Sequence, residues 1–321
     1  MFYDEKKKIL TINEHGAYLS KDHEVLIVKT KEGKERILFQ NLKKIETINN
    51  FLVTKAVINQ CIIDDIKFIC FSKKGAPLFS FMDLRPESRF LRTISTRLKM
   101  SQFTRTQLSK RFVINSIKGK LSFLRYKKSS IERTNSLPEL ENYISKLDTL
   151  IKETKKVKGR YAITKDTLLG LESQSANIYF TKCFPLFFDS DIYCGNRIKE
   201  NPRDIMNMCL NYSYGILRSD IFTRLINKVI NPFDSIYHYQ ENKYGMFLVF
   251  DLMEGFRHTV SDIAVNNLLI LKKITNENIE NNFLDINARK MLIEQTKINI
   301  SKRELLIEKN INIVRKYKNN Q

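Results

Sequence analysis

The sequence has no apolar run that approaches the ~20 residues needed for a membrane-spanning helix. Its first six residues, Met-Phe-Tyr-Asp-Glu-Lys, lack the apolar core of a secretory signal. Its positive charge is not gathered into a short cluster beside an apolar segment, which argues against a membrane-surface protein. We therefore expect a cytoplasmic protein that does not contact a membrane.

Cysteine is scarce and shows no ligand spacing. The five cysteines are odd in number, and none forms a pair separated by two residues. This usage is typical of reduced thiols in a cytoplasm and argues against a zinc site. Internal repeats and low-complexity segments are also absent from the sequence.

Positive charge is what the sequence has in excess. Its 55 Lys and Arg residues face 35 Asp and Glu residues, which gives a net charge of +20 and a pI near 9.6. Such a surplus predicts a polyanionic partner, with nucleic acid first and an anionic membrane second. With 321 residues, of which 42% are hydrophobic, the chain is long enough for two domains and a sizeable core.

The local pattern of the sequence changes at Pro86, which predicts domains at residues 1–85 and 86–321. The first segment alternates short β-branched or aromatic runs with turns, as a small β-rich domain does. The residue before a proline is pushed out of helical geometry, so Arg85-Pro86 is the expected hinge. Helical spacing follows it, which predicts an all-α second domain and an α+β fold overall. The expected strands are Ile9–Ile12, Ala17–Ser20, Val25–Lys29, Arg36–Phe39 and Lys67–Ser72, with one helix at Val53–Cys61.

Capping signals predict where several helices of the second domain begin. Pro138 suits the first turn of one helix. Thr164 and Asp166 can cap the helix that carries Glu172. Asn201, followed by proline, predicts the start of a long helix. Further helices are expected at residues 260–270 and at about residues 288–317.

Most of the surplus charge lies in residues 86–160, which carry 19 basic and 6 acidic side chains. There Arg111, Lys118 and Arg125 recur every seven residues on one face of an expected helix, while Ile and Leu form a stripe on another face. Any one of these side chains alone is best explained as a solvated surface residue. The segment as a whole predicts a surface that contacts phosphates, because like charges at this density repel unless something neutralises them.

Two carboxylates occur on an otherwise apolar helix that is expected after Gly245. Asp251 and Glu254 are three residues apart and so project from one helix face, with His238 a short distance upstream. Burying two adjacent carboxylates is costly unless a cation neutralises them, and a divalent metal is one explanation. The alternative is that both acids face solvent from an ordinary amphipathic helix. The apolar positions expected to be buried are Phe247, Phe250 and Phe256.

A third acid, Glu172, lies among leucines on its expected helix, where an unpaired carboxylate would be costly. Glu172, His238, Asp251 and Glu254 together offer imidazole nitrogen and carboxylate oxygen without a thiol. Such donors suit Mn²⁺ or Mg²⁺. Spacing along the chain does not show whether Glu172 meets the other residues in space.

Four motifs, in order, resemble those of the CRISPR-associated adaptation endonuclease and integrase. Residues 169–180, which contain Glu172, are similar to its Gly-hydrophobic-Glu-Gly-x-x-Ala-x-x-Tyr-Phe motif. The two patterns Asn-Pro-x-Asp at 201–204 and Asn-Tyr-x-Tyr at 211–214 are similar to its next block. His238 with residues 250–257 resembles its His and Asp-Leu-Met-Glu-Glu-Phe-Arg block, and residues 11–19 resemble its opening strands. The resemblance covers essentially the whole chain.

The chain departs from this family pattern at four positions. Ser173 and Ser235 stand where glycine is usual, Gly255 where a second glutamate is common, and His258 where proline is usual. None of these changes removes an expected ligand. His258, four residues after Glu254, could extend the site, but we expect it at the surface.

The resemblance implies a metal-dependent DNA endonuclease and integrase of CRISPR adaptation, which is part of antiviral defence. It implies Glu172, His238 and Glu254 as the catalytic ligands of Mg²⁺ or Mn²⁺, with Asp251 as a supporting acid or occasional ligand. Spacers would be inserted into the CRISPR array by phosphodiester transfer from a DNA 3′-hydroxyl. The expected DNA-binding residues are Arg89, Arg92, Arg111, Lys118, Arg125, Tyr212 and Arg257.

The partners that the resemblance implies are double-stranded DNA, both prespacer and CRISPR repeat, a second copy of the chain in a homodimer, and a small ferredoxin-like adaptation subunit. Two other readings of the sequence remain. The protein could be a non-catalytic, basic nucleic-acid-binding scaffold whose acids are solvated or structural. It could also be an unrelated helical, metal-dependent nuclease that digests DNA without joining ends.

Overall fold

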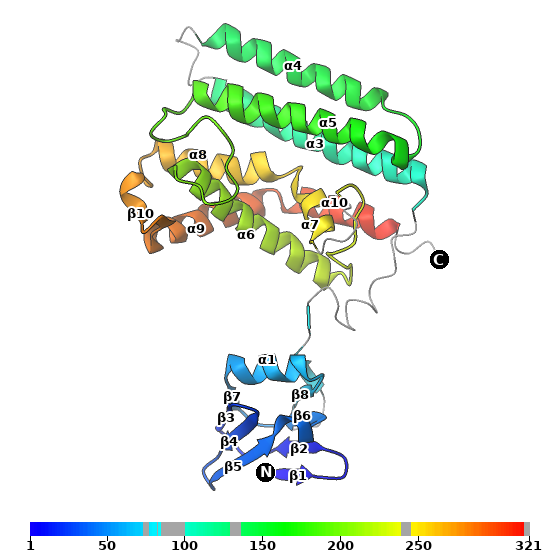
Figure 1. Ribbon diagram of the computed structural model, residues 1–321, viewed down its shortest axis with the longest axis vertical. Coiled ribbons are helices and arrows are strands. Elements are labelled where there is room, and N and C mark those ends of the chain that lie inside the picture. Colours follow the sequence, from blue (N-terminus) through cyan, green and yellow to red (C-terminus); the bar gives the residue numbers. More distant parts are fainter. Residues whose placement is uncertain (73–76, 82, 85–99, 129–135, 239–244, 318–321) are drawn as a thin grey trace. The chain divides into compact units, whose positions relative to one another are not determined.

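The computed structural model describes residues 1–72, 77–81, 83–84, 100–128, 136–238 and 245–317 (Figure 1). Internal contacts divide the chain into two units, Met1–Thr93 and Ile94–Gln321. The expected domain boundary at 85/86 and the hinge at Arg85-Pro86 lie outside the described residues. Each unit is described by itself. None of the helices in the described ranges is long and apolar enough to cross a membrane.

The N-terminal unit contains two β-sheets. Their strands are β1 (Phe2–Asp4), β2 (Ile9–Ile12), β3 (Ala17–Asp22), β4 (Val25–Lys29), β5 (Lys34–Leu38), β6 (Lys44–Thr47), β7 (Phe51–Val53), β8 (Lys67–Phe71) and β9 (Pro77–Ser80). One sheet has the order β1-β2-β6-β8-β9 and the other β5-β4-β3-β7. In the first sheet, Leu10, Ile45 and Phe68 are paired across parallel strands and are fully buried. Helix α1 (Lys55–Ile63) contacts β3 and β8, and it completes this core with Val57 and Cys61.

All five expected strands are confirmed to within a few residues, and the expected helix is shifted by two residues at each end. Strands β1, β6, β7 and β9 were not expected. They are three or four residues long, which is too short for alternation to stand out. Strand β6 is a strand because β2 and β8 pair with both of its edges, and that constraint is not local to its sequence.

The second unit is helical, so the chain has the expected α+β fold. Its helices are α3 (Gln102–Lys128), α4 (Leu137–Lys156), α5 (Tyr161–Asn177), α6 (Ile205–Asn227), α7 (Phe247–Met253), α8 (Ile263–Ile270), α9 (Ile286–Lys302) and α10 (Glu304–Lys316). Strands β10 (Ile279–Glu280) and β11 (Phe283–Leu284) form a small hairpin. Two segments are π-helical, Ile178–Cys183 directly after α5 and Arg257–Asp262 shortly after α7. Such segments are often found at functional sites.

Helix α3 connects the parts of this unit. It packs against α4, α5 and the π-helical segment 257–262, and Figure 1 shows it running alongside α4 and α5. The expected apolar stripe of Ile114, Ile117, Leu121 and Leu124 is largely confirmed, since the last three are buried and Ile114 is half-buried. The exposed face that remains carries the basic residues that recur every seven positions.

Three of the expected helix boundaries are wrong. Helix α5 begins at Tyr161, so Thr164 lies inside it, buried, and donates its hydroxyl to the carbonyl of Arg160 at 3.2 Å. Helix α6 is capped by Asp204, which accepts the backbone N–H of Asn207 at 2.8 Å, and not by Asn201. The expected helix at about residues 288–317 is two helices that separate at Arg303.

The aromatic positions of α7 also differ from expectation. Phe256 is buried, whereas Phe247 and Phe250 are only half-buried. The fully buried apolar positions of this short helix include Leu248 and Val249 instead. Helix α7 has only seven residues. This is too few for the spacing of apolar residues in the sequence to show which face of the helix is buried.

Helix α3 approaches the chain after α7 closely at two glycines. A Cβ atom at Gly119 would lie 3.3 Å from Cδ2 of His258, and one at Gly255 would lie 3.2 Å from Cβ of Asn115. These separations are tighter than ordinary carbon–carbon contacts of about 3.5–4.0 Å. The two glycines therefore allow α3 to reach the residues that follow α7.

We expect Gly119→Leu to destabilise the protein by roughly 1–3 kcal/mol, because the added side chain would collide with His258 in a packed interior. Urea unfolding followed by circular dichroism measures the change. Gly170→Leu on α5 is the matched control, since Gly170 is exposed and a Cβ there meets nothing within 4 Å. Its stability should stay the same or rise, because glycine within a helix is unfavourable. Equal losses in the two variants would contradict the close approach at Gly119.

Candidate active site

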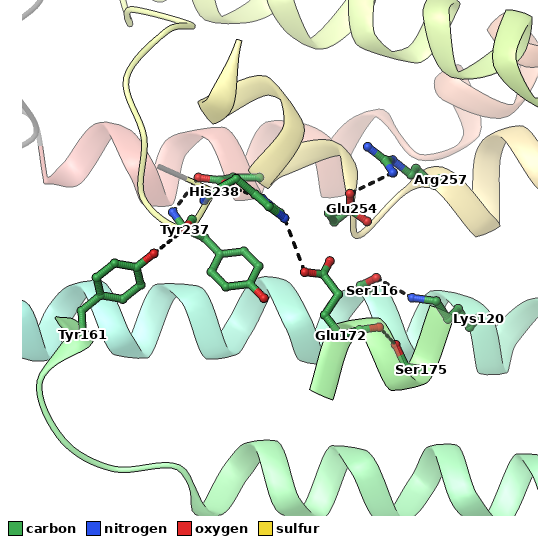
Figure 2. A network of polar contacts seen from close by, with 10 residues as sticks. Ser116, Lys120, Tyr161, Glu172, Ser175, Tyr237, His238, Glu254 and Arg257 are labelled. Atoms are coloured by element: carbon green, nitrogen blue, oxygen red, sulfur yellow. Dashed lines mark hydrogen bonds and ion pairs between the residues drawn. The ribbon is translucent and has the colours of Figure 1, made fainter. Parts of the chain in front are cut away.

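The side chains of Glu172 and His238 meet, although they come from distant parts of the sequence. Glu172 lies on α5, and His238 lies in the segment that follows α6. Nε2 of His238 is 3.4 Å from Oε2 of Glu172, and only 27% and 14% of the two side chains are exposed (Figure 2). The structure thus brings together two of the three ligands expected from the sequence.

Asp251 fixes the orientation of the His238 ring. Its Oδ2 accepts the backbone N–H groups of Ile236 and Tyr237, both at 2.9 Å. Its Oδ1 accepts the backbone N–H of His238 at 3.1 Å and lies 2.7 Å from Nδ1 of the same residue. A histidine whose Nδ1 is held by a carboxylate presents Nε2 in a fixed direction, as metal-ligating histidines do. Both oxygens of Asp251 are engaged, which favours its supporting role over that of an occasional ligand.

Two further contacts hold the segment that contains His238. Arg105 of α3 donates to the backbone carbonyl of Ser235 at 2.7 Å. Tyr161, the first residue of α5, donates its hydroxyl to the carbonyl of Tyr237 (Figure 2). The segment is therefore tied to three helices, α3, α5 and α7, before the chain continues past His238.

The contact between Glu172 and His238 is electrostatic as well as geometric. Burial favours the neutral imidazole, but the hydrogen bonds and charges of Asp251 and Glu172 outweigh it and raise the pKa of His238 to about 10. Burial also favours the protonated form of Glu172, but the hydrogen bond and charge of His238 and the charge of Lys120 lower the pKa of Glu172. Without a metal, the two side chains thus form an ion pair.

Glu254 follows α7 and is directed toward Arg257. It is 8% exposed, and its Oε1 lies 3.0 Å from Nη1 of Arg257. The Arg257 guanidinium also lies over the ring of Tyr214, at 5.3 Å from its centre. Arg257, which we expected to bind DNA, is therefore engaged by a neighbouring carboxylate and an aromatic ring.

Lys120 of α3 is a buried member of the site that the sequence analysis missed. Only 2% of this residue is exposed, and Nζ donates to Oγ of Ser116 at 2.8 Å. Burial lowers the pKa of Lys120, while the charges of Glu254 and Glu172 act in the opposite direction. The signal was present in the helical spacing, because Lys120 lies within the apolar stripe, three residues after Ile117 and four before Leu124.

His258 is buried, so the expectation of a surface position is wrong. It is 2% exposed, and its Nδ1 lies 2.7 Å from Oδ2 of Asp262. Asp262 also accepts the hydroxyls of Tyr179 at 2.8 Å and Tyr214 at 2.7 Å. The π-helical segment turns His258 inward against Gly119. This network connects the two π-helical segments, and sequence spacing alone did not identify Asp262 or Tyr179 as members of it.

Apart from Arg257, the expected DNA-binding residues fall into three groups. Arg111, Lys118 and Arg125 are exposed on α3, and Arg125 lies 3.3 Å from Asp148 of α4. Lys118 projects roughly 200° around the helix from Ser116 and from Lys120, so this basic face is directed away from the candidate site. Tyr212 is half-buried on α6. Arg89 and Arg92 lie outside the described residues.

The donor set has the chemistry that Mg²⁺ or Mn²⁺ requires, because it combines an oriented imidazole nitrogen with carboxylate oxygens. As the side chains stand, however, no three His, Cys, Asp or Glu residues in the described part of the chain converge closely enough to hold an ion. Glu254, the third expected ligand, is paired with the guanidinium of Arg257.

Comparison with known proteins decides the family. The model of the family described as CRISPR associated protein Cas1 matches residues 10–297. The chain belongs to the Cas1 family. Among its relatives, CRISPR-associated endonuclease Cas1 3 of Thermus thermophilus is 25% identical over 276 residues, which cover 85% of this chain and 77% of the relative.

Solved structures show the same fold at lower identity. A chain of a partial Cas6-RT-Cas1–Cas2 complex matches with a TM-score of 0.57 and 18% identity, over 97% of this chain and 96% of the other. A casposase bound to an integration product matches with a TM-score of 0.57 and 17% identity, over 98% and 91% of the two chains. The β-sheet unit followed by a helical unit is thus an arrangement that this Cas1-family chain shares with solved structures.

We expect Asp251→Asn to destabilise the protein by about 3 kcal/mol, because an amide cannot accept all of the hydrogen bonds and leaves the imidazole with only one of its two carboxylate partners, Glu172. Urea unfolding in the presence of EDTA measures the loss. Asp166→Asn is the matched control, since Asp166 is an exposed acid on α5, and its effect should stay within about 0.5 kcal/mol. A loss for Asp251→Asn as small as that of the control would show that Asp251 does not hold this segment.

Proposed function

We propose that this chain is a divalent-metal-dependent DNA endonuclease and integrase of CRISPR adaptation, which inserts new spacers into the CRISPR array. The observation that carries the proposal is the imidazole of His238, held at Nδ1 by Asp251 and facing Glu172 with Nε2. The relative from Thermus thermophilus is named an endonuclease, and the casposase of similar fold is bound to an integration product. Both support this assignment.

We assign Glu172, His238 and Glu254 as the residues that hold Mg²⁺ or Mn²⁺. The bound cation would supply positive charge to the phosphate oxygens as negative charge develops on them. The chain itself orients the imidazole through Asp251 and keeps both glutamates in a largely buried setting. Glu254 would have to leave Arg257 to join the other two ligands, which would free the guanidinium for a phosphate.

The proposed reaction is phosphodiester transfer from a DNA 3′-hydroxyl, which joins a spacer end to the array. The same site would nick DNA if water replaced the hydroxyl, because only the nucleophile differs. His238 is assigned as a ligand and not as the general base, since an imidazole that uses Nε2 as a ligand and Nδ1 for Asp251 has no nitrogen left to accept a proton.

The proposed partners are double-stranded DNA, as prespacer and as CRISPR repeat, a second copy of the chain in a homodimer, and a small ferredoxin-like adaptation subunit. Arg111, Lys118 and Arg125 would contact the DNA backbone from the exposed face of α3. A solved complex of similar fold contains both Cas1 and Cas2, which supports a second Cas subunit. We place the protein in the cytoplasm, where the CRISPR array would be reached.

The alternative function is a non-catalytic, basic nucleic-acid-binding scaffold. The contact between Glu254 and Arg257 favours it, because a structural ion pair needs no metal. The orientation of His238 argues against it, since Asp251 holds Nδ1 and so presents Nε2 toward Glu172, an arrangement typical of metal-ligating histidines. A helical nuclease that only digests DNA is the second alternative.

Glu172→Gln is expected to reduce strand cleavage and strand joining by at least about 100-fold, because it removes a ligand charge while it keeps the shape of the side chain. Gel analysis of a nicked or branched DNA substrate measures both products. DNA binding should change by no more than about twofold, since Glu172 is directed into the site. Glu153→Gln, an exposed acid on α4, is the control and should keep full activity. A parallel loss of binding and activity would favour the scaffold.

A donor duplex that ends in a 3′-dideoxynucleotide separates an integrase from a digestive nuclease. The wild-type protein should join a donor with a 3′-hydroxyl to the target and should fail with the dideoxy donor. Nicking by water should continue with both donors. Digestion without any joined product would contradict the integrase assignment and leave the nuclease.

Replacing Arg111, Lys118 and Arg125 together by glutamine is expected to weaken the binding of duplexes of any sequence. The slope of log K against log[salt] should fall in magnitude by roughly 2–3, about 0.9 for each lost phosphate contact. Fluorescence anisotropy at several salt concentrations measures it. The control replaces Lys272, Lys273 and Lys290, exposed lysines elsewhere in the helical unit, by glutamine. An equal change of slope in the two triple variants would show a general effect of net charge.

A further inference from the structure

We propose that Tyr214 is a positioning residue, which holds the guanidinium groups of Arg197 and Arg257 against its ring as a pair of contacts for DNA phosphates beside the candidate site. The part that concerns DNA rests on the proposed function, since it requires that the chain binds DNA. The part that concerns the two arginines does not, because it describes contacts within the folded chain. Tyr214 ends the Asn-Tyr-x-Tyr pattern at 211–214, and neither the proposed metal ligands nor the basic face of α3 gives it a role.

The first support is the way in which the Tyr214 ring is fixed. Its hydroxyl donates to Oδ1 of Asp262 at 2.7 Å, and Asp262 is only 1% exposed. The other oxygen of Asp262 accepts the hydroxyl of Tyr179 at 2.8 Å and lies 2.7 Å from Nδ1 of His258. Both oxygens of this buried carboxylate are engaged, so the Tyr214 ring is held by a group that is itself held.

The second support is the π-helical segment 257–262, which carries Arg257 at its start and Asp262 at its end. In an α-helix, two residues five positions apart project in directions roughly 140° apart. The hydrogen bonds of a π-helix join residues five positions apart, so these residues lie one turn from each other. Tyr214 therefore meets both ends of the segment, because its hydroxyl contacts Asp262 while the Arg257 guanidinium lies 5.3 Å from the centre of its ring.

The third support is Arg197, whose guanidinium lies 5.2 Å from the centre of the same ring. Its Nη1 donates to Oδ1 of Asn207 at 2.9 Å, and its Nη2 donates to Oδ1 of Asn211 at 2.6 Å. Asn207, Asn211 and Tyr214 are spaced by four and three residues on α6, so they form one stripe along that helix. The stripe holds Arg197 beside the ring, as the π-helical segment holds Arg257.

The charges of the two arginines are compensated differently. The oxygens that accept from Arg197 belong to two side-chain amides and to the carbonyl of Ile198, and no Asp or Glu in the described ranges forms an ion pair with it. Arg257 has Glu254 as its partner (Figure 2). If Glu254 turned to a cation, the contact with Tyr214 would remain and would keep the Arg257 guanidinium in place.

The ligand that fits this pair is a phosphodiester. Each guanidinium gains from the negative face of the aromatic ring, but two positive charges held against one ring also repel each other. Phosphate oxygens relieve that repulsion, and they match the planar N–H donors of arginine. Tyr214 itself would not contact the DNA. It would act by fixing where the two positive charges lie.

The first test measures the salt dependence of duplex binding in EDTA, by fluorescence anisotropy, for Tyr214→Leu. This change removes no charge, yet the slope of log K against log[salt] should fall in magnitude by roughly 1–2, about 0.9 for each phosphate contact that is lost. In a background with Arg197→Gln and Arg257→Gln, the same change should leave the slope unaltered. An unaltered slope in the wild-type background, or an equal fall in both backgrounds, would overturn the proposal.

Phe222→Leu is the matched control for the loss of an aromatic ring. Phe222 is a half-buried residue of the same helix, and its ring packs against that of Phe233. Its removal should lower Tm, as the removal of the Tyr214 ring should, but it should leave the slope at the wild-type value. A fall of slope in Phe222→Leu equal to that in Tyr214→Leu would show a general effect of disturbing α6 and would overturn the positioning role.

The second test needs no DNA. In a nuclear magnetic resonance spectrum, the Nε–H signals of Arg197 and Arg257, assigned from their loss in Arg197→Lys and Arg257→Lys, should be displaced by the ring current of Tyr214. They should return to ordinary positions in Tyr214→Leu, and signals that do not move would overturn the positioning role. If the wild type binds no DNA, the proposed function fails, while this measurement still decides whether Tyr214 holds the two groups.

Tyr214→Phe replaces Tyr214→Leu if the latter does not fold. It keeps the ring but releases it from Asp262, so both the salt slope and the displacement of the arginine signals should fall by less than a full loss of the ring would cause. Values of both equal to those of the wild type would overturn the proposal, because the ring would then be held without Asp262.

Discussion

The candidate site depends on the carboxylate of Asp251 and on the turn of backbone that it holds. This buried side chain accepts three successive backbone N–H groups, at residues 236 to 238, and contacts the ring of His238. A buried charge with this many donors is well compensated, and it connects α7 to the segment after α6. The orientation of the imidazole toward Glu172 depends on this carboxylate, while Arg105 and Tyr161 hold the same segment from α3 and α5.

The other acidic side chains of the site are paired with basic side chains of the same chain. Glu172 contacts His238, Glu254 contacts Arg257, and the buried Lys120 donates to the hydroxyl of Ser116. Each carboxylate thus has a cationic partner from the protein itself, which is what a fold without bound metal requires. One face of helix α3 lies at the buried site. The opposite face is exposed and carries Lys118.

The strands from Ile9 to Lys29 were found because alternation is local. Glu172, His238 and Glu254 were singled out because motif spacing is also local, and their role as metal ligands stays a prediction. The contact between Glu172 and His238 was not predictable from spacing. Thr164 and His258 were placed wrongly for the same reason, since tertiary packing buries a threonine inside α5 and turns a histidine inward on a π-helical segment. Lys120 was overlooked because a lysine in a basic segment is expected to be a solvent-exposed surface residue.

A site that is neutralised by its own side chains differs from a structural metal centre, in which the unfilled ligands repel and the fold depends on the ion. Here a cation would have to take Glu172 from His238 and Glu254 from Arg257. In the proposed site His238 would stay as a ligand beside Glu172, and only the Arg257 guanidinium would be released, close by and suited to a phosphate. Under the proposed function, exchange of partners of this kind would couple metal binding to DNA binding without a large movement, because only side chains would change their contacts. The buried charge of the site would then be compensated in both states, by protein alone in one and by metal and phosphate in the other.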